Sequence, residues 1–309
     1  MSKLQGKTVL VTGGAGFIGS HLVDTLLAEG AKVRVLDNLE TGHRENLAHA
    51  DIDFHEADIR DLDACHAACK GVDLVFHQAA LGSVPRSMKD PSKSLAVNVG
   101  GTANVFTAAR DAGVKRVVYA SSSSVYGDNE SLPKREGQEG QPMSPYALSK
   151  VMNEQLARVY ARCFDMQFVG LRYFNVYGRR QDPNGPYAAV IPRFFAAAAA
   201  GEAPIIFGDG QQSRDFTHVS DVTRANLLAG LAATEGALAL NIGAGSTTTV
   251  LELAETILAT MGAKVKPTFT ESRAGDVRFS RADASLARGA IGWQATIALD
   301  EGLSLTRPE

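Results

Sequence analysis

The sequence has few cysteines and no long run of apolar or basic residues. Its three cysteines, Cys65, Cys69 and Cys163, lack the spacing and partners of a zinc site, so we expect Cys65 and Cys69 to be reduced packing residues. No apolar run approaches the length of a membrane span, and the first residues do not form a signal peptide. Because the formal net charge is −3 and no basic cluster is present, we expect no nucleic-acid partner. These absences predict a cytoplasmic protein without a metal site.

The sequence does contain a regular alternation of short β-rich runs and helical stretches. Its 309 residues are 45% hydrophobic and 21% charged, which is typical of one large globular domain or two smaller ones. Strands separated by helices predict an α/β fold with a Rossmann-type, doubly wound parallel sheet covered on both faces. We expect strands at 8–11, 32–36, 53–56, 73–77, 116–120 and 167–172, and helices at 17–28, 98–112 and 146–164.

The alternation loosens after about residue 174, where we expect a smaller C-terminal α/β lobe. A loop at 179–187 holds two prolines and a glycine. The elements that we expect beyond it are helices near 187–199, from 220 and near 249–260, and strands at 205–207, 239–242 and 266–270. We expect residues of about 218–243 to return and pack on the first lobe.

The stretch V-T-G-G-A-G-F-I-G-S (11–20) follows the first expected strand and opens the first helix. Gly13, Gly16 and Gly19 have the spacing G-x-x-G-x-x-G. A pyrophosphate can lie against a helix N-terminus only where no Cβ intervenes, so this pattern predicts a dinucleotide cradle. The alternative is a glycine-rich turn with a purely structural role.

Asp37 closes the second expected strand, 24 residues after Gly13. A carboxylate at this place accepts hydrogen bonds from both adenosine ribose hydroxyls and repels a 2′-phosphate, which favours NAD over NADP. NADP stays open because His43 and Arg44 lie just downstream. For His77, at the end of the fourth strand, packing is the favoured interpretation over catalysis.

The run A-S-S-S-S-V-Y-G (120–127) ends the fifth expected strand, and S-P-Y-A-L-S-K (144–150) begins a long helix. Ser144 suits the helix cap and Pro145 the first helical position. Tyr146 and Lys150 then lie one turn apart on one helix face. A tyrosine titrates near pH ~10, so a base at pH 7 needs its phenolate stabilised by roughly 4 kcal/mol. Lys150 and a charged nicotinamide supply that stabilisation in our interpretation; an amphipathic helix with an incidental Tyr and Lys is the alternative.

Four motifs carry a resemblance that covers essentially the whole chain: T-G-G-A-G-F-I-G, S-S-S-S-V-Y-G, S-P-Y-A-L-S-K and L-R-Y-F-N-V-Y-G. In this order they resemble the extended short-chain dehydrogenase/reductase family. The segments H-Q-A-A-L-G-S-V-P-R-S (77–87) and 173–192 are similar to the subgroup of nucleotide-sugar 4-epimerases that acts on UDP-N-acetylglucosamine and UDP-N-acetylgalactosamine, or on their uronic acids.

The resemblance implies an isomerase that uses NAD and a transient 4-keto sugar. Tyr146 would move the proton of the sugar 4-hydroxyl, Lys150 would hold the nicotinamide ribose and lower the pKa of Tyr146, and Ser122 matches the catalytic serine/threonine. The first lobe, 1–174 with about 218–243, would bind NAD, and about 175–217 with 244–309 would bind the UDP-sugar. The expected cofactor contacts are Gly13, Gly16, Phe17, Ile18, Gly19, Asp37, Asn38, Gly42, Asp58, Ile59, Gln78, Ala79, Ala80, Asn98, Tyr146, Lys150 and Tyr173.

The resemblance also implies a set of UDP-sugar contacts. Arg214 and Arg273 match two diphosphate-binding arginines, and guanidinium groups suit such oxygens because they bind them in a bidentate fork. Asp276 matches a contact to the uridine ribose. The full set is Gly82, Ser83, Arg86, Ser122, Ser123, Ser124, Asn175, Ala189, Val190, Arg214, Arg273, Asp276 and Ser280.

Two details favour an epimerase that accepts acetamido sugars. Related dehydratases and decarboxylases place an acidic residue beside the serine/threonine, whereas this strand end has only serines. Ser280 stands four residues after Asp276, where a small residue leaves room for an N-acetyl group. A UDP-glucose or UDP-uronate 4-epimerase is the alternative, and a non-catalytic NAD-sensing protein is a remote one. Family relatives dimerise through two helices per subunit, so we expect a homodimer through helices near 92–112 and 146–163.

Overall fold

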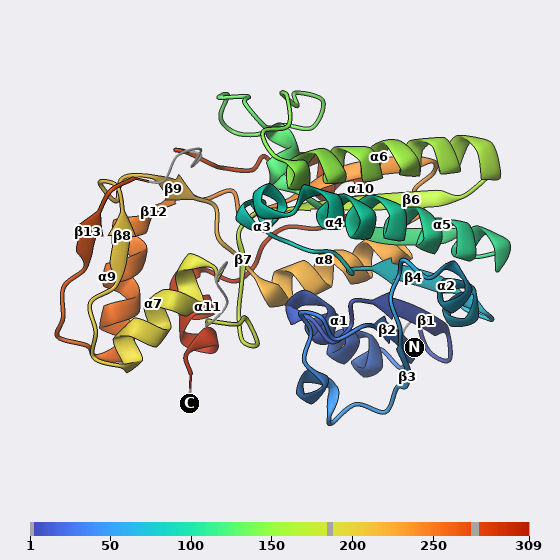
Figure 1. The fold of residues 1–309 in the computed structure, drawn as a ribbon, viewed down its shortest axis with the longest axis horizontal. Helices are drawn as coiled ribbons and strands as arrows, with labels where there is room; N and C mark the ends of the chain where they lie inside the picture. Colours follow the sequence, from blue (N-terminus) through green and yellow to red (C-terminus); the bar gives the residue numbers. More distant parts are fainter. Residues whose placement is uncertain (1–2, 184–187, 273–277, 309) are drawn as a thin grey trace.

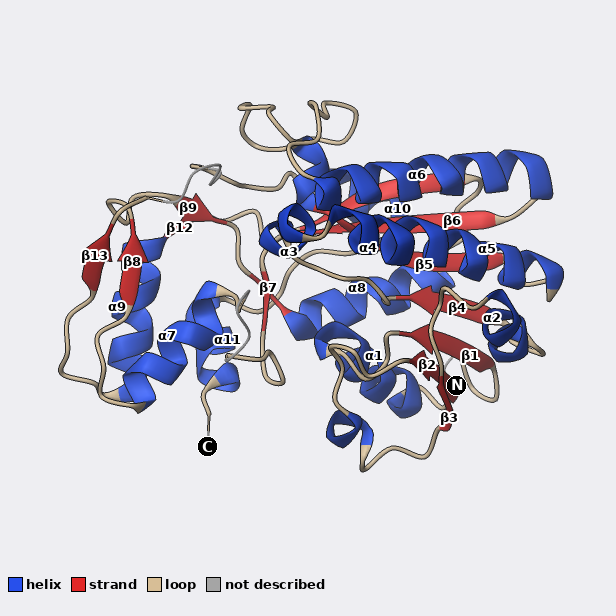
Figure 2. Ribbon diagram, viewed as in Figure 1, coloured by secondary structure: helices blue, strands red, loops and turns tan. Residues whose placement is uncertain are grey.

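The computed structural model describes residues 3–183, 188–272 and 278–308, and its larger part is built on a seven-stranded sheet (Figures 1 and 2). The strand order is β11-β6-β5-β4-β1-β2-β3, and every pairing is parallel. The strands are β1 (Thr8–Thr12), β2 (Lys32–Asp37), β3 (Asp53–Glu56), β4 (Leu74–His77), β5 (Arg116–Ser122), β6 (Gln167–Tyr173) and β11 (Ala237–Ile242). All their carboxyl ends therefore lie along one edge of the sheet, as the sequence predicts.

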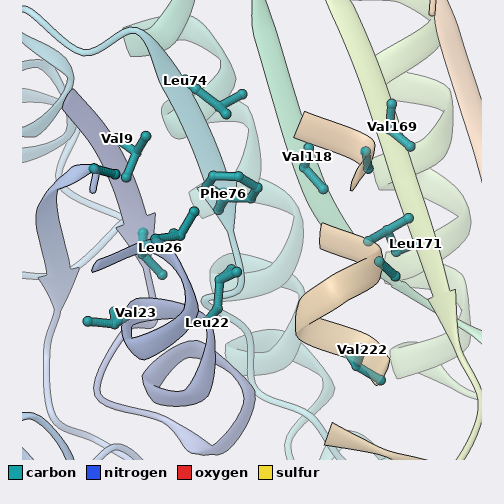
Figure 3. Close-up of a cluster of buried hydrophobic side chains, with 14 of the residues drawn as sticks. Val9, Leu22, Val23, Leu26, Leu74, Phe76, Val118, Val169, Leu171 and Val222 are labelled. Carbon is teal, nitrogen blue, oxygen red and sulfur yellow. The ribbon is translucent and has the colours of Figure 1, made fainter. Parts of the chain in front are cut away.

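Helices cover both faces of this sheet, and each face has its own apolar core. One face packs against α1, α8 and α10, and Leu22, Phe76 and Val222 belong to one buried apolar cluster there (Figure 3). The opposite face packs against α2, α5 and α6 around Phe106. These helices are α1 (Phe17–Ala28), α2 (Leu62–Cys69), α5 (Thr102–Asp111), α6 (Pro145–Phe164), α8 (Val219–Leu231) and α10 (Ser285–Ile291).

Residues 218–243 return to the first lobe. Helix α8 packs beside α1, and β11 pairs with β6 at the edge of the sheet, with Leu240 opposite Leu171. Both leucines are fully buried. This return packs α8 against β4 and β6 of the sheet.

The C-terminal lobe lies to the left of the sheet in Figure 1 and has a separate core around Phe194, Ile206 and Ile257. Its elements are α7 (Val190–Ala199), α9 (Val250–Met261), α11 (Leu299–Thr306), β8 (Ile205–Phe207) and β13 (Thr268–Thr270). Two further short pairings are β7 (Val176–Tyr177) with β10 (Thr217–His218), which is parallel, and β9 (Ser213–Arg214) with β12 (Thr248–Thr249), which is antiparallel. In the described ranges no helix is long and apolar enough to cross a membrane.

Several helical segments differ from the expectation. Two short helices follow β4: α3 (Val84–Lys89) and α4 (Pro91–Leu95). Ser83 and Asp90 cap them by accepting hydrogen bonds from their first turns, and a proline lies in the first turn of each. The helix expected at 98–112 begins earlier, with a π-helical segment η2 (Ala96–Gly101). Short 3₁₀ segments occur at η1 (Arg44–Leu47) and η3 (Ser123–Tyr126). The two helical cysteines, Cys65 and Cys69, are buried and unbridged, as predicted.

Candidate active site

The glycine-rich turn runs from β1 into α1, and two of its glycines have no room for a side chain. A Cβ on Gly19 would lie 2.0 Å from the carbonyl oxygen of Gly13, and a Cβ on Gly13 would lie 2.6 Å from the backbone nitrogen of Ala79. Gly13 also has a φ of +70°, which favours glycine. These two glycines are thus required by the close packing of the turn itself.

Gly16 differs because space opens beside it. A Cβ there would meet only the Gly13 oxygen, at 3.3 Å, and Gly16 is the N-cap of α1 with no side-chain cap. The free N–H groups of the first turn therefore face the cavity. The turn fits a dinucleotide phosphate at this helix N-terminus.

Asp37 ends β2 beside this turn and is buried, with one carboxylate oxygen accepting from the Ala15 N–H at 2.9 Å and the other from the Leu39 N–H at 2.8 Å. Burial raises the pKa of Asp37, and the two backbone hydrogen bonds oppose that rise. Farther along the edge, Asn38 donates to Asp58 at 2.7 Å. The adenosine side of the cavity thus presents fixed carboxylates, which fits unphosphorylated ribose hydroxyls.

A cavity of about 350 Å³ follows the carboxyl edge of the sheet from these carboxylates to Tyr146 and Lys150. It brings together every expected cofactor contact except Asn98. The expected residues that line it are Gly13, Gly16, Phe17, Ile18, Gly19, Asp37, Asn38, Gly42, Asp58, Ile59, Gln78, Ala79, Ala80, Tyr146, Lys150 and Tyr173, and the expected substrate contact Gly82 lines it as well. Asn98 is fully buried instead. Its side chain accepts from the Leu81 N–H and donates to the Leu81 carbonyl, and Leu81 does line the cavity.

Tyr146 and Lys150 line this cavity, and Ser122, the last residue of β5, neighbours Tyr146 without lining the cavity itself. Ser144 caps α6 by accepting from the Ala147 N–H at 3.1 Å, and Pro145 is the first helical residue, as the sequence predicts. The side chains of Tyr146 and Ser122 are hydrogen-bonded. Lys150 Nζ donates to the Ala120 carbonyl at 2.8 Å and lies 5.8 Å from the centre of the Tyr146 ring.

The electrostatics of this trio depart in one respect from the sequence expectation. Burial lowers the pKa of Lys150 to about 8, while the Glu154 carboxylate opposes that shift. Removal from water raises the pKa of Tyr146, and the Ser122 hydrogen bond only partly opposes this. Desolvation outweighs the Ser122 hydrogen bond, so the chain's own residues leave Tyr146 protonated at neutral pH. The lowering of the Tyr146 pKa that the sequence predicts is therefore not provided by the protein alone.

Glu154 lies one turn beyond Lys150 on α6 and connects three elements of the site. Its carboxylate accepts from Ser121 Oγ at 2.6 Å, and from Arg172 Nε at 2.9 Å and Nη2 at 2.7 Å. Arg172, on β6, is 1% exposed and also donates to Tyr126 and Glu139. This buried pair ties the helix of Tyr146 to the strand ends that carry Ser122 and Tyr173.

Comparison with known proteins agrees with this geometry. The model of the NAD dependent epimerase/dehydratase family matches residues 9–243. The chain belongs to this family. A UDP-glucose 4-epimerase of Mycolicibacterium smegmatis is 43% identical over 303 residues, covering 96% of each chain. A UDP-N-acetylglucosamine 4-epimerase structure from Methanobrevibacter ruminantium superposes with a TM-score of 0.93 at 38% identity, covering 98% of this chain and 97% of that one. A UDP-glucose 4-epimerase from Thermus thermophilus in complex with NAD gives 0.88 at 35% identity, covering 97% of each.

A second cavity of about 190 Å³ lies within the C-terminal lobe. Three expected substrate contacts line it: Asn175, Val190 and Arg214. Ala189 does not line it, although the neighbouring Ala188 does. Arg273 and Asp276 lie outside the described residues.

Four further expected sugar contacts line neither of these two cavities: Ser122, Ser123, Ser124 and Ser280. Ser124 Oγ is buried and has no hydrogen-bond partner in the described part of the chain, which fits a group that meets a ligand. Ser123 begins η3, and Ser122 caps it by accepting from the Ser124 N–H. Ser280 is buried against β9, its N–H donating to Ser213 O at 3.2 Å.

Two expected sugar contacts lie in different surroundings from those predicted. Arg86 is on α3, not in a loop, and faces a separate hollow on the surface that Glu40 also lines. Ser83 is the cap of the same helix and accepts from the Arg86 N–H at 3.2 Å. The Ser83 side chain is therefore engaged in holding α3.

Sequence reasoning missed several members of this family site. Arg193 and Gln212 line the second cavity together with Arg214. Glu154 and Arg172 bind each other beside the strand end that carries Ser121 and Ser122. A signal was present for Glu154, because the spacing of four residues from Lys150 on one helix face was readable. Arg193 lies in a helix with an apolar pattern and carried no such signal.

Proposed function

We propose that this chain interconverts the C4 epimers of a UDP-hexose, with UDP-N-acetylglucosamine and UDP-N-acetylgalactosamine as the preferred pair. The observation that supports this best is that Tyr146 and Lys150 line the glycine-cradled cavity beside Ser122, on a strand end that carries only serines. The residues that line this cavity would hold NAD, which would supply the hydride-transfer chemistry needed at C4. The residues of the chain then have to handle the proton.

Tyr146 and Ser122 handle the proton of the sugar 4-hydroxyl. Together they offer that hydroxyl two oxygen partners at one place. Tyr146 would accept the proton as a phenolate, which Lys150 and the positive charge of a bound nicotinamide would stabilise, and would return it after the keto sugar has turned over. Lys150, with a pKa of about 8, is mainly charged at pH 7 and places its positive charge next to Tyr146. Its hydrogen bond to Ala120 O fixes the ammonium to the strand end.

An epimerase is favoured over a dehydratase because no carboxylate at this strand end is free to act as an acid. Glu154 reaches the strand end, but both its oxygens bind Arg172 and one also binds Ser121. A carboxylate whose two oxygens are both engaged by Arg172 is not positioned to act on a leaving hydroxyl. Tyr146 remains as the proton carrier in both directions, which is what inversion at C4 requires.

The nucleotide diphosphate is assigned to the second cavity. Arg214 lines it and is positioned by donating to Ser213 O at 2.9 Å, and Arg193 approaches from α7. Two guanidinium groups suit the two phosphates. We assign NAD binding to residues 1–174 with about 218–243, and UDP-sugar binding to about 175–217 and 244–309.

The acetamido preference rests on the small side chain of Ser280 and on the unpartnered Ser124 hydroxyl. UDP-glucose and UDP-uronates are the alternative substrates. Turnover of UDP-N-acetylglucosamine, UDP-glucose and UDP-glucuronate, followed separately by NMR, tests the assignment. A higher kcat/KM for the acetamido sugar supports it, and preference for another sugar contradicts it. A protein that binds NAD but turns over none of the sugars would instead be the non-catalytic NAD-sensing type.

A homodimer is part of the proposal. Leu148, Met152 and Val159 lie on one face of α6 and are 40%, 40% and 43% exposed. An apolar stripe of this kind on a long surface helix is typical of a helix-bundle interface. Sedimentation should give a dimer, and Met152→Lys should shift it toward monomer; a monomeric wild-type chain would contradict the proposal.

A further inference from the structure

Asn226 lies on α8, behind the wall of the NAD cavity, and is fully buried. It does not line the cavity, but it binds two residues that do. Gln78 Nε2 donates to Asn226 Oδ1 at 2.9 Å, and Asn226 Nδ2 donates to the Tyr173 hydroxyl oxygen at 2.9 Å. Gln78 and Tyr173 both line the cavity that also contains Tyr146 and Lys150.

The three side chains close a ring of hydrogen bonds. The Tyr173 hydroxyl donates to Gln78 Oε1 at 3.1 Å, which completes the circuit through Asn226. A phenol has a single proton, so the Tyr173 hydroxyl donates either to Gln78 Oε1 or to Asn226 Oδ1, at 3.2 Å, while its oxygen accepts from Asn226 Nδ2. The second Asn226 N–H donates to Val222 O at 2.8 Å, so the amide of Asn226 is fixed from its own helix.

The ring has two consequences at the cavity wall. It favours one orientation of the Gln78 amide, since a flipped amide would set acceptor against acceptor at Asn226 and donor against the donating hydroxyl at Tyr173. It also holds the Tyr173 ring at one orientation without a charged group. Because α8 comes from the returning segment 218–243, this part of the wall is set by a residue far along the chain from the glycine cradle.

We propose that Asn226 is a positioning residue for the nicotinamide end of the cofactor site, acting through Gln78 and Tyr173. The proposal rests on NAD binding and not on the identity of the sugar. NAD and NADH binding to the full-length chain, measured without any sugar, therefore tests it separately from the proposed epimerase activity.

The decisive variant is Asn226→Leu, which keeps the branched shape of the side chain and removes its hydrogen bonds to Gln78, Tyr173 and Val222. We expect its dissociation constant for NAD, measured by calorimetry, to rise about tenfold. We also expect the emission maximum and intensity of bound NADH to change, because the wall that the nicotinamide meets is no longer fixed. The matched control is Thr223→Val on the same helix: Thr223 is equally buried, but its hydroxyl bonds only to Ser220 O of its own turn.

A double-mutant cycle separates positioning from general weakening of the fold. Tyr173→Phe removes the same ring from the cavity side, so the NAD affinity of Asn226→Leu/Tyr173→Phe should match that of the weaker single variant. Asn226→Asp is a second test should the leucine variant fold poorly: it keeps the shape and the Gln78 bond but loses the donor to Tyr173. The proposal is overturned if the folded Asn226 variants bind NAD and NADH as Thr223→Val does, or if the two effects simply add.

Discussion

The role of Glu154 gives a prediction with two measurable parts. Glu154→Gln keeps the shape of the side chain and its bond to Ser121 but removes the charge that faces Arg172 and Lys150. Arg172 is 1% exposed, and removing one partner of a buried ion pair costs about 3–5 kcal/mol. Arg172 keeps Tyr126 and Glu139 as partners, so we expect the lower end, about 3 kcal/mol. At roughly 2 °C per kcal/mol, this lowers Tm by about 6 °C.

The second part concerns the pH dependence of activity. The groups that act on Lys150 electrostatically are Glu154 and Tyr146 on its own helix and His77 on β4. Glu154 opposes the drop in the pKa of Lys150, so without its charge that pKa falls below about 8. Activity that needs charged Lys150 is lost as the pH rises through this pKa. The alkaline limb of kcat/KM should therefore move to lower pH in Glu154→Gln.

Glu139→Gln is the matched control for this experiment. Glu139 also binds Arg172, but it comes from the loop after β5, its side chain is 29% exposed, and it is not among the groups that shift the pKa of Lys150. We expect a smaller fall in Tm and an unchanged alkaline limb. If both variants move the limb equally, or neither does, the coupling of Glu154 to Lys150 is wrong.

Three further predictions concern the site and its support. Tyr146→Phe should lower kcat by about 10²–10⁴-fold while the calorimetric NAD affinity stays unchanged, and near-normal turnover would remove Tyr146 from the mechanism. Ser280→Tyr should abolish turnover of UDP-N-acetylglucosamine but retain that of UDP-glucose. Equal loss of both activities would refute the idea that the small side chain of Ser280 leaves room for the N-acetyl group. Burial raises the pKa of Asp215 from 3.8 to about 6, so the folded protein gains stability as the pH falls through this range. Denaturant unfolding should show wild type gaining about 2 kcal/mol over Asp215→Asn between pH 7 and 4.5, and a pH-independent difference would contradict this.

The parts of the fold that the sequence predicts best are those specified locally. The helix 17–28 and the start of α6 at Pro145 follow from glycine, serine and proline signals, and the structure matches them. Parallel strand order then brings Asp37, Ser122 and Tyr173 to one edge, because the carboxyl ends of parallel strands coincide. This is why so many expected cofactor contacts line a single cavity.

The parts that the sequence does not predict depend on contacts between distant segments. Asn226 and Gln78 are 148 residues apart, and no local pattern marks an asparagine in the middle of α8 as part of a cavity wall. Arg193 reaches the second cavity only because α7 packs in the C-terminal lobe. Asn98 lies in the π-helical segment η2 and binds the backbone of Leu81, a contact between segments 17 residues apart. At Tyr146, burial and the Ser122 hydrogen bond oppose each other, and only the structure shows that burial prevails there.

The most direct test of the whole account is the product formed from UDP-N-acetylglucosamine by the purified chain with NAD. Proton NMR of the sugar should show the C4 epimer, UDP-N-acetylgalactosamine, accumulating to an equilibrium that is also reached from the opposite epimer. The same spectra should contain no 4-keto-6-deoxy sugar, because Glu154 is engaged by Arg172 and Ser121. An unchanged spectrum, or a dehydrated product, would contradict the proposal that Tyr146 carries the proton in both directions.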